Sequence, residues 1–361
     1  MNVGSTKEKS PEKRIAISPD TSKNLKDLGL NVFLEKGYGE NLGYSDQEYQ
    51  DKGASILNSA KEVISKLDLL CKVNFPTEED LNSIKENSHL IVANYNPEKE
   101  KNFLKQKINI FALNLLPRIT RAQSMDVLSS QANLAGYRAV IESIYEYEKA
   151  IPMMMTAAGT VPAAKVLVIG AGVAGLQAIA TAKRLGAIVS ATDVRLTAKE
   201  QVESLGGKFL TVEGSENLET KGGYAKEAGE DFKKKQAQML ENAASKSDII
   251  ICTALVPGKP APRIINENII KNMKPGSVIF DLAVTQGGNA AYSESDKTVI
   301  KNGVKIIGIS NVMNKLPLTA SNLYAKNIFN FVKNLYSKEK KQFILNTEDE
   351  IIKNTLINRS N

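Results

Sequence analysis

The feature that most constrains the fold is a set of three glycines with fixed spacing that directly follows a short apolar segment. Residues 165–169 read Lys-Val-Leu-Val-Ile, and Gly170, Gly172 and Gly175 come next, at the start of a helical pattern. This order of strand, tight turn and helix is typical of a dinucleotide-binding βαβ unit. We expect Gly170 to make the turn, Gly172 to leave room for a pyrophosphate and Gly175 to let helix and strand approach closely. The free N–H groups at the helix start would then face the phosphates.

A carboxylate follows the next predicted strand. Asp193 comes 18 residues after Gly175, directly after the predicted strand Ala187–Thr192. In this position a carboxylate can accept hydrogen bonds from the adenosine ribose and would repel a 2′-phosphate, so the pattern favours NAD(H) over NADP(H). Arg195 complicates the inference because an arginine nearby can serve a 2′-phosphate. A purely structural role for Asp193, in capping a turn, stays open.

Two series of short apolar segments alternate with amphipathic ones, which predicts α/β architecture with doubly wound parallel sheets covered on both faces. Predicted strands of the first series are Arg14–Ile17, Val32–Glu35, Asp68–Val73, Leu90–Ala93 and Ile108–Leu113, with helices at Thr21–Leu28 and Glu78–Lys85. Predicted strands of the second are Lys165–Gly170, Ala187–Thr192, Lys208–Val212, Asp248–Ala254, Ser277–Ala283 and Val304–Ile309.

The length of 361 residues fits two domains. A long helical pattern over about 123–150 links the two series, and a further helical stretch from 312 to about 337 is expected to return to the first domain. We therefore expect an N-terminal domain of residues 1–125 plus 315–361, and an NAD(H)-binding domain of residues 126–314 that includes the linking helix. The polar tract 213–236 is too long for an ordinary connection and is interpreted as a functional loop.

Composition narrows the function classes. The formal charge is +7, but the lysines are scattered among acidic residues, which indicates a solvated surface rather than a nucleic-acid interface. One histidine and two cysteines in apolar runs indicate neither a metal centre nor a disulfide framework. The polar N-terminus resembles no secretory signal, and the apolar stretch 166–182 is shorter than a membrane span. We expect a cytoplasmic protein that does not insert into a membrane.

Five further stretches are long and specific: 117–137, 153–162, 199–207, 222–227 and 253–258. With the glycine motif, they resemble the alpha subunit of the proton-translocating nicotinamide nucleotide transhydrogenases over essentially the whole chain. The resemblance implies two Rossmann-like domains with the nicotinamide in the cleft between them, and a homodimer. It further implies an NADP(H)-binding beta subunit and a membrane-helix subunit as partners, and a peripheral place on the inner face of the cell membrane.

The resemblance also implies residue roles. Gln123 matches the residue that touches the nicotinamide ring, and Arg118, Asp126 and Ser129 match its polar neighbours. Tyr224 matches a tyrosine on a mobile loop that closes over the site. By the same matching, the nucleotide is lined by Ser124, Met125, Val173, Asp193, Val194, Arg195, Gly223, Gln236 and Leu255.

The side chains of this segment agree with the implied chemistry. Hydride transfer between two nicotinamides moves no proton to or from a substrate heteroatom, so it needs no general acid or base. It needs distance, ring orientation and exclusion of water. Arginine, glutamine, aspartate and serine suit orientation better than proton transfer. A structural role for this helix start stays possible.

Alanine dehydrogenase, which has the same fold, is the alternative. Its early lysine motif appears here as Lys72-Val73-Asn74-Phe75-Pro76, which lacks the second lysine. Its proton-donating histidine would fall near residues 94–96, whereas His89 lies several residues earlier, and Thr285 replaces an aspartate. Amino-acid oxidation needs a proton acceptor and a carboxylate-binding group, so three departures at once argue against it. A non-catalytic NAD-sensing module is the third hypothesis.

Overall fold

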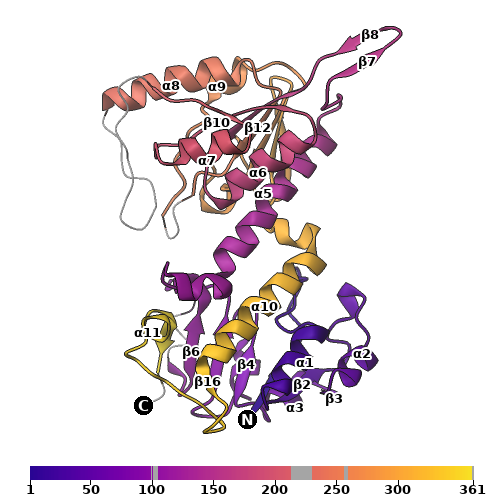
Figure 1. Ribbon diagram of the computed structural model, residues 1–361, viewed down its shortest axis with the longest axis vertical. Coiled ribbons are helices and arrows are strands. Elements are labelled where there is room, and N and C mark those ends of the chain that lie inside the picture. Colours follow the sequence, from indigo (N-terminus) through magenta and orange to yellow (C-terminus); the bar gives the residue numbers. More distant parts are fainter. Residues whose placement is uncertain (99, 101–104, 213–229, 256–258, 360–361) are drawn as a thin grey trace. The chain divides into compact units, whose positions relative to one another are not determined.

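The computed structural model describes residues 1–98, 100, 105–212, 230–255 and 259–359. The chain divides into two compact units (Figure 1). Unit 1 comprises Met1–Gln131 and Met313–Asn361, and unit 2 comprises Ala132–Val312. Each unit contains one seven-stranded, mainly parallel sheet. The predicted α/β class with two parallel-sheet domains is therefore confirmed.

The sheet of unit 1 has the order β18-β6-β5-β4-β1-β2-β3, with β1 in its interior and only β18 antiparallel to its neighbour. Val3 of β1 pairs with Val32 on one side and with Leu69 on the other. The strands are β1 (Asn2–Ser5), β2 (Asn31–Glu35), β3 (Ala54–Leu57), β4 (Leu69–Cys71), β5 (His89–Val92), β6 (Asn109–Ala112) and β18 (Leu356–Asn358).

Helices cover both faces of this sheet. Successive residues of a strand point to opposite faces, so they pack alternately in two separate cores. Cys71 packs in one core with residues of α1, α10 and α11, whereas Leu70 packs in the other with residues of α3 and α4. The helices are α1 (Pro19–Asp27), α2 (Asp46–Asp51), α3 (Ala60–Ile64), α4 (Glu78–Leu81), α10 (Pro317–Leu335) and α11 (Glu350–Thr355). Short elements are η1 (Glu40–Leu42), η3 (Leu113–Leu115), η4 (Thr120–Met125), η6 (Val312–Lys315) and the hairpin β16 (Tyr336–Ser337) with β17 (Gln342–Phe343).

The predicted strand Arg14–Ile17 is wrong, although its apolar residues are buried as expected. Its backbone N–H groups donate to side chains instead of a neighbouring strand. Ile15 donates to the Ser321 hydroxyl at 3.1 Å, and Ala16 donates to the Tyr38 hydroxyl at 2.9 Å. The strand in this part of the chain is β1, whose four residues include one large apolar side chain, Val3.

The sheet of unit 2 has the order β11-β10-β9-β12-β13-β15-β14, and β14 is antiparallel to β15. Each of the six strands predicted for the second series has its counterpart here, and each observed strand is one or three residues shorter than predicted. The strands are β9 (Lys165–Ile169), β10 (Ile188–Thr192), β11 (Lys208–Phe209), β12 (Ile249–Cys252), β13 (Val278–Asp281), β14 (Lys297–Lys301) and β15 (Val304–Gly308).

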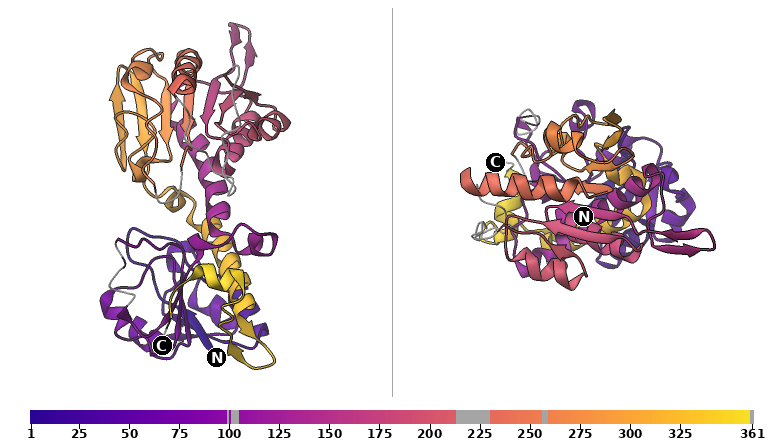
Figure 2. Two further views of the ribbon diagram at one scale, coloured as in Figure 1. Left: turned by 90° about the vertical axis from the view of Figure 1, so that its left-hand side faces the viewer. Right: turned by 90° about the horizontal axis from the view of Figure 1, so that it is seen from above.

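Helices also pack on this sheet. Residues of α8 and α9 share a core with Leu167, Ile250 and Ile279 of the central strands, and α6 contacts β9 and β10. The helices are α6 (Val173–Arg184), α7 (Ala198–Ser204), α8 (Glu230–Ala244) and α9 (Glu267–Lys271), with η5 (Val284–Gln286) and the hairpin β7 (Met154–Thr156) with β8 (Gly159–Val161). This hairpin extends beyond the body of unit 2 in Figure 1 and in both views of Figure 2.

The predicted linking helix is shorter than expected. Helix α5 runs over Val127–Glu146 rather than 123–150 and passes from one unit into the other. Residues 120–125 form the 3-10 turn η4 instead. In the described part of the chain, no helix has both the length and the apolar character needed to cross a bilayer.

Candidate functional site

The glycine motif of unit 2 lies where the strand order reverses. From β9 the chain continues to β10 and β11 on one side, and later returns to β12 on the other side of β9. In open α/β sheets, ligands bind at the carboxyl ends of the strands at such a switch point. Gly170 follows β9 and Thr253 follows β12, so both lie at this edge.

The three glycines meet the steric requirements expected from the sequence. Gly170 has a φ of +93°, which L side chains rarely adopt. A Cβ on Gly175 would lie 1.8 Å from the Gly170 carbonyl oxygen, so α6 packs against the turn at backbone distance. A Cβ on Gly172 would meet no described atom within 4 Å. The space beside Gly172 is the space that a pyrophosphate needs.

Helix α6 begins at this turn with its dipole directed at the same space. Its first hydrogen bond runs from the Leu176 N–H to the Gly172 carbonyl at 2.8 Å, so the three preceding amides lie before the helical ladder. Val173 in this first turn and Leu255 after β12 both have exposed apolar side chains, at 41% and 36%. The edge therefore offers amide donors together with apolar surface, a combination that suits a dinucleotide.

Two residues that the sequence analysis did not single out hold this edge in place. The Thr253 hydroxyl donates to the Gly170 carbonyl at 2.8 Å and thereby ties β12 to the turn. The Asn289 side-chain amide donates to the Ala254 carbonyl at 2.9 Å, and its oxygen accepts from the Ala254 N–H at 3.1 Å. Thr253 could have been found as the first polar residue after a buried strand. Asn289 carries no comparable signal.

Asp193 follows β10 at the same edge and contacts the glycine turn directly. Its carboxylate accepts a 2.7 Å hydrogen bond from the Ala171 N–H and pairs with Arg195. Burial alone would raise the pKa of Asp193, but the hydrogen bonds from Arg195 and Ala171 hold this pKa below its ordinary value. Asp193 is therefore ionised at neutral pH. Val194, which lies between Asp193 and Arg195 in the sequence, is half-buried.

The remaining predicted nucleotide residues of unit 2 are only partly described. Gly223 and Tyr224 lie outside the described residues, as does the tract 213–229. The rest of the predicted loop is helical, because α8 begins at Glu230. Gln236 lies in this helix and is half-buried.

The segment implied to contact the nicotinamide lies in unit 1, after β6. Asp126 separates the turn η4 from α5 and caps the helix. Its Oδ1 accepts from the Ser129 N–H at 2.9 Å and its Oδ2 accepts from the Ser129 hydroxyl at 2.6 Å. The predicted helix start at residue 123 is therefore moved to Val127 by a capping aspartate. Asp126 and Ser129 are brought together as a hydrogen-bonded pair.

Helix α10 fixes the backbone of η4. The Ser124 carbonyl accepts hydrogen bonds from the side-chain amides of Asn327 at 2.9 Å and Asn330 at 3.0 Å. Arg121 of the same turn donates to the Asp349 carboxylate at 2.9 Å. Met125 is buried. The turn η4 is thus held by hydrogen bonds from α10, by the contact of Arg121 with Asp349 and by the buried side chain of Met125.

The side chains of Arg118 and Gln123 are exposed on this fixed segment. Among the described residues, the Gln123 side chain has no hydrogen-bond partner. A rigid backbone that presents an uncommitted amide is suited to orient a ligand group. The segment from Arg118 to Ser129 contains no histidine that could exchange a proton with a ligand.

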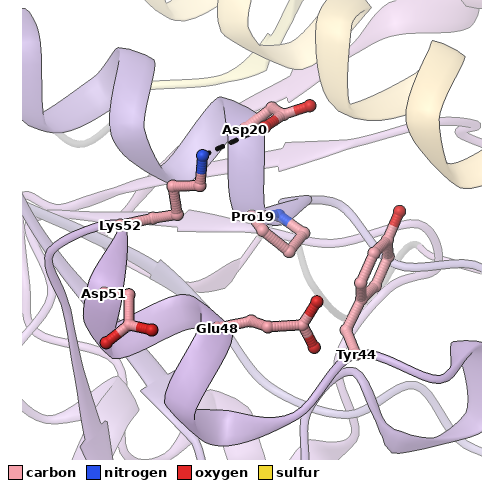
Figure 3. Close-up of a pocket in the computed structure, with 6 residues that line it drawn as sticks. All are labelled: Pro19, Asp20, Tyr44, Glu48, Asp51 and Lys52. Carbon is pink, nitrogen blue, oxygen red and sulfur yellow. Dashed lines mark ion pairs between the residues drawn. The ribbon is translucent and has the colours of Figure 1, made fainter.

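A surface pocket of about 220 Å³ also lies in unit 1, between α1 and α2 (Figure 3). Figure 3 shows its lining residues: Pro19, Asp20, Tyr44, Glu48, Asp51 and Lys52. The Lys52 Nζ lies 3.7 Å from the Asp20 carboxylate. None of the predicted site residues lines this pocket. In the parts that the structure describes, no cluster of histidine, cysteine and acidic side chains could hold a metal ion.

Comparison with known proteins identifies the family. Two family models match the chain, one for each domain. The model described as "Alanine dehydrogenase/PNT, N-terminal domain" matches residues 4–135, and the model described as "Alanine dehydrogenase/PNT, C-terminal domain" matches residues 139–361. An NAD(P) transhydrogenase alpha subunit of Rhodospirillum rubrum is 51% identical over 371 residues, which cover 99% of this chain and 96% of that protein. The chain belongs to the NAD(P) transhydrogenase alpha-subunit family. The predicted resemblance is thereby confirmed.

Further transhydrogenases are similar to this chain in sequence and in structure. The corresponding subunit of Rickettsia prowazekii is 45% identical, with 99% of this chain and 95% of that protein covered. The crystal structure of transhydrogenase from Sinorhizobium meliloti superposes with a TM-score of 0.90 at 45% identity, covering 100% of this chain and 99% of that one. An L-alanine dehydrogenase structure superposes with a TM-score of 0.80 at 22% identity, which shows a shared fold. The transhydrogenase family is an oxidoreductase family that binds NAD(H).

Proposed function

We propose that this chain is the NAD(H)-binding subunit of a proton-translocating transhydrogenase. It transfers a hydride directly between its own NAD(H) and NADP(H) held by a beta subunit. Membrane subunits couple the transfer to proton movement, and the chain itself lies on the inner face of the cell membrane through these partners. The bound nicotinamide supplies the redox chemistry, since its C4 carbon gives or takes two electrons and a proton together.

The switch-point edge of unit 2 supports the binding part of this proposal. The amides of α6 and the space beside Gly172 receive the pyrophosphate, and Asp193 receives the adenosine ribose. By the family resemblance, the residues that line the nucleotide are Val173, Val194, Arg195, Gly223, Gln236 and Leu255. NADP(H) is disfavoured because an ionised Asp193 repels a 2′-phosphate.

The observation that carries the catalytic part is the fixed turn η4 with its exposed Gln123. Direct hydride transfer requires orientation without proton exchange. Gln123 steers the nicotinamide, and Arg118, Ser124, Met125 and the Asp126–Ser129 pair support it. The family resemblance also assigns Tyr224, which lies outside the described residues, to the nicotinamide end of the site. No residue of this set needs to change its protonation state during the reaction.

The geometry of Lys72 argues against amino-acid oxidation. Its ammonium donates to the Thr6 carbonyl at 3.0 Å and the Lys7 carbonyl at 2.8 Å, and pairs with Glu8 at 3.3 Å. An ammonium has three N–H donors, so none is left for a substrate carboxylate. Both side chains of the ion pair are almost completely buried.

His89 is equally unsuited to the role of a proton donor. It lies in β5, against Phe111 and Phe343, and is buried. Burial lowers the pKa of His89 to about 4, so the imidazole is neutral near pH 7. Neither Lys72 nor His89 can therefore serve as the carboxylate-binding group or the proton donor that amino-acid oxidation needs.

Exposed apolar side chains at one end of unit 2 support a homodimer. The hairpin β7–β8 carries Met155, which is 82% exposed, and a two-stranded hairpin alone is marginally stable in water. Its base lies against the α6–β10 turn, because a Cβ on Gly186 would fall 2.7 Å from the Pro152 Cβ. The exposed apolar residues of the hairpin and of the adjoining α6–β10 turn, which we call the hairpin patch, are Met153, Met154, Met155, Leu185 and Ile188. A second copy of the chain covers this patch.

A stopped-flow experiment tests the proposed activity. The purified chain is loaded with NADH and mixed with the NADP(H)-binding subunit carrying an NADP⁺ analogue. We expect rapid oxidation of NADH with matching reduction of the analogue, and no turnover of NAD⁺ with L-alanine. Turnover of L-alanine would favour the dehydrogenase alternative. NADH binding without either reaction would leave an NAD-sensing module.

A further inference from the structure

The first turn of α6 is in backbone contact on two sides, and only one of these contacts is part of the glycine motif. On the sheet side, Gly175 lies against the Gly170 carbonyl, which is itself held by the Thr253 hydroxyl at 2.8 Å. The turn therefore cannot move toward β9.

On the other side, α5 crosses α6 at Gly136. A Cβ on Gly136 would lie 1.9 Å from the Ala174 carbonyl oxygen and 3.0 Å from the Ala174 Cα. Both are backbone atoms of the same first turn, so no side-chain rotation could relieve the contact. About one helical turn from Gly136, the Asn133 side-chain amide donates to the Gln177 side-chain oxygen at 3.1 Å. The two helices therefore meet through a glycine and a hydrogen bond.

We propose that Gly136 is a positioning residue for the dinucleotide site. With Gly175 on the opposite side, it holds the first turn of α6 in a fixed place between β9 and α5. The amides before Leu176 belong to this turn, so its position determines where they meet a pyrophosphate. Gly136 acts through α6 and touches no reacting atom.

A methyl group at residue 136 has no space to enter unless α6 or α5 moves. Because Gly175 already contacts the Gly170 carbonyl, α6 cannot retreat toward the sheet. The first turn must tilt or slide, and its amides leave the positions that suit the phosphates. Helix propensity acts in the opposite direction, since alanine is a better helix former than glycine. If conformational freedom were the only role of Gly136, alanine there would stabilise the protein and leave NADH binding unchanged.

The variant Gly136→Ala tests this proposal in the full chain, and Gly308→Ala is its matched control. A Cβ on Gly308 would lie 2.3 Å from the Glu294 carbonyl oxygen, which is also a backbone contact within unit 2 but lies on β15, away from the glycine turn. Both variants are studied by circular dichroism at a temperature below their unfolding transitions. The NADH dissociation constant of the folded protein is then measured by nucleotide fluorescence.

We expect Gly136→Ala to weaken NADH binding at least about tenfold, because the displaced amides would lose hydrogen bonds to the charged pyrophosphate. We expect Gly308→Ala to change the NADH dissociation constant less than about twofold, even where it lowers the melting temperature. Adenosine, which has no phosphate, should displace NADH from wild type and Gly136→Ala with similar inhibition constants. Equal effects of the two substitutions on NADH, or no effect of Gly136→Ala, would overturn the proposal.

Asn133→Ala covers the case in which Gly136→Ala does not fold. It removes only the hydrogen bond beside the contact and adds no atom. We expect NADH binding about threefold weaker in this variant at an unchanged melting temperature. An unchanged NADH affinity would then count against the proposal. Wild-type NADH binding is the reference in each comparison, so a wild-type chain that fails to bind NADH would contradict the proposed function instead.

Discussion

Asp193 holds Arg195 through both of its carboxylate oxygens. Oδ1 accepts from the Arg195 N–H at 2.8 Å and from its Nε at 2.9 Å, while Oδ2 accepts from its Nη2 at 2.8 Å. The Ala171 N–H donates to Oδ2 as well. A carboxylate has about four lone-pair sites, so these four N–H donors occupy all of them. A ribose hydroxyl can reach Asp193 only when an Arg195 contact gives way.

The charge of Asp193 should decide the choice of cofactor. We expect wild type to bind NADH at least about tenfold more tightly than NADPH, since the ionised carboxylate would face the 2′-phosphate. Asp193→Asn should remove most of this preference, and Asp27→Asn on α1 should not. Fluorescence titration with both nucleotides measures the ratio. Comparable wild-type affinities would remove Asp193 from this role.

The Asp193–Arg195 pair should also make stability depend on pH. Because the folded-state pKa of Asp193 lies below its ordinary value of 3.8, the pair stabilises the protein above that pH and loses its effect as the pH falls through the folded-state pKa. Arg195→Met should therefore lower the free energy of unfolding by about 2 kcal/mol at pH 7 and 5. The difference should shrink below pH 3.8. Urea unfolding across this range measures it, and a constant difference would be the contrary result.

Gln123 should affect the hydride step far more than NADH binding. Gln123→Asn keeps the amide group but shortens the side chain by one methylene. Because Asn327 and Asn330 hold the backbone of η4 in place, the backbone cannot move to compensate. A misplacement of about 1 Å can cost on the order of a hundredfold in rate. We expect near-normal NADH affinity and transfer at least roughly tenfold slower, equivalent to about 1.4 kcal/mol in the barrier. Single-turnover kinetics separates the two effects.

Gln201→Asn, on the exposed face of α7, is the matched control for this substitution and should leave both quantities unchanged. Loss of NADH affinity with an intact transfer rate in Gln123→Asn would make Gln123 a binding residue only.

The hairpin patch should be required for dimer formation. Met155→Glu places a charge on a side chain that is 82% exposed in the single chain, and burying that charge against a second copy would be costly. Sedimentation velocity should then show monomers at concentrations where wild type is dimeric. Ile300→Glu, at a 62% exposed position on the edge strand β14, is the control and should stay dimeric. A dimeric Met155→Glu would exclude the patch as the interface.

The sequence was most informative where local pattern and fold coincide. The apolar run before Gly170 and the spacing to Gly175 are local signals, and the structure places them at the reversal point of the sheet as expected. Asp193 could be placed at the same edge because it directly follows a strand. Family resemblance added the turn η4, which no periodicity marks as functional.

The sequence was least informative where contacts are distant. Ser124 and Asn327 lie about 200 residues apart, so their hydrogen bond leaves no local signal. Strand β1 was missed because Val3 is its one large apolar residue, and the segment after Arg14 was mistaken for it because its apolar residues are equally buried. The start of α5 was readable in principle, since Asp126 and Ser129 have the spacing of a helix cap.

The central claim is that hydride passes directly from the NADH of this chain to NADP⁺ on a partner subunit. Isotope transfer tests this claim most directly. NADH with deuterium at both C4 positions is bound to the chain and mixed with the NADP⁺-loaded beta subunit, and the NADPH formed is analysed by mass spectrometry. Direct transfer predicts one deuterium in each NADPH and none in the solvent. NADPH without deuterium, or deuterium released to water, would contradict it.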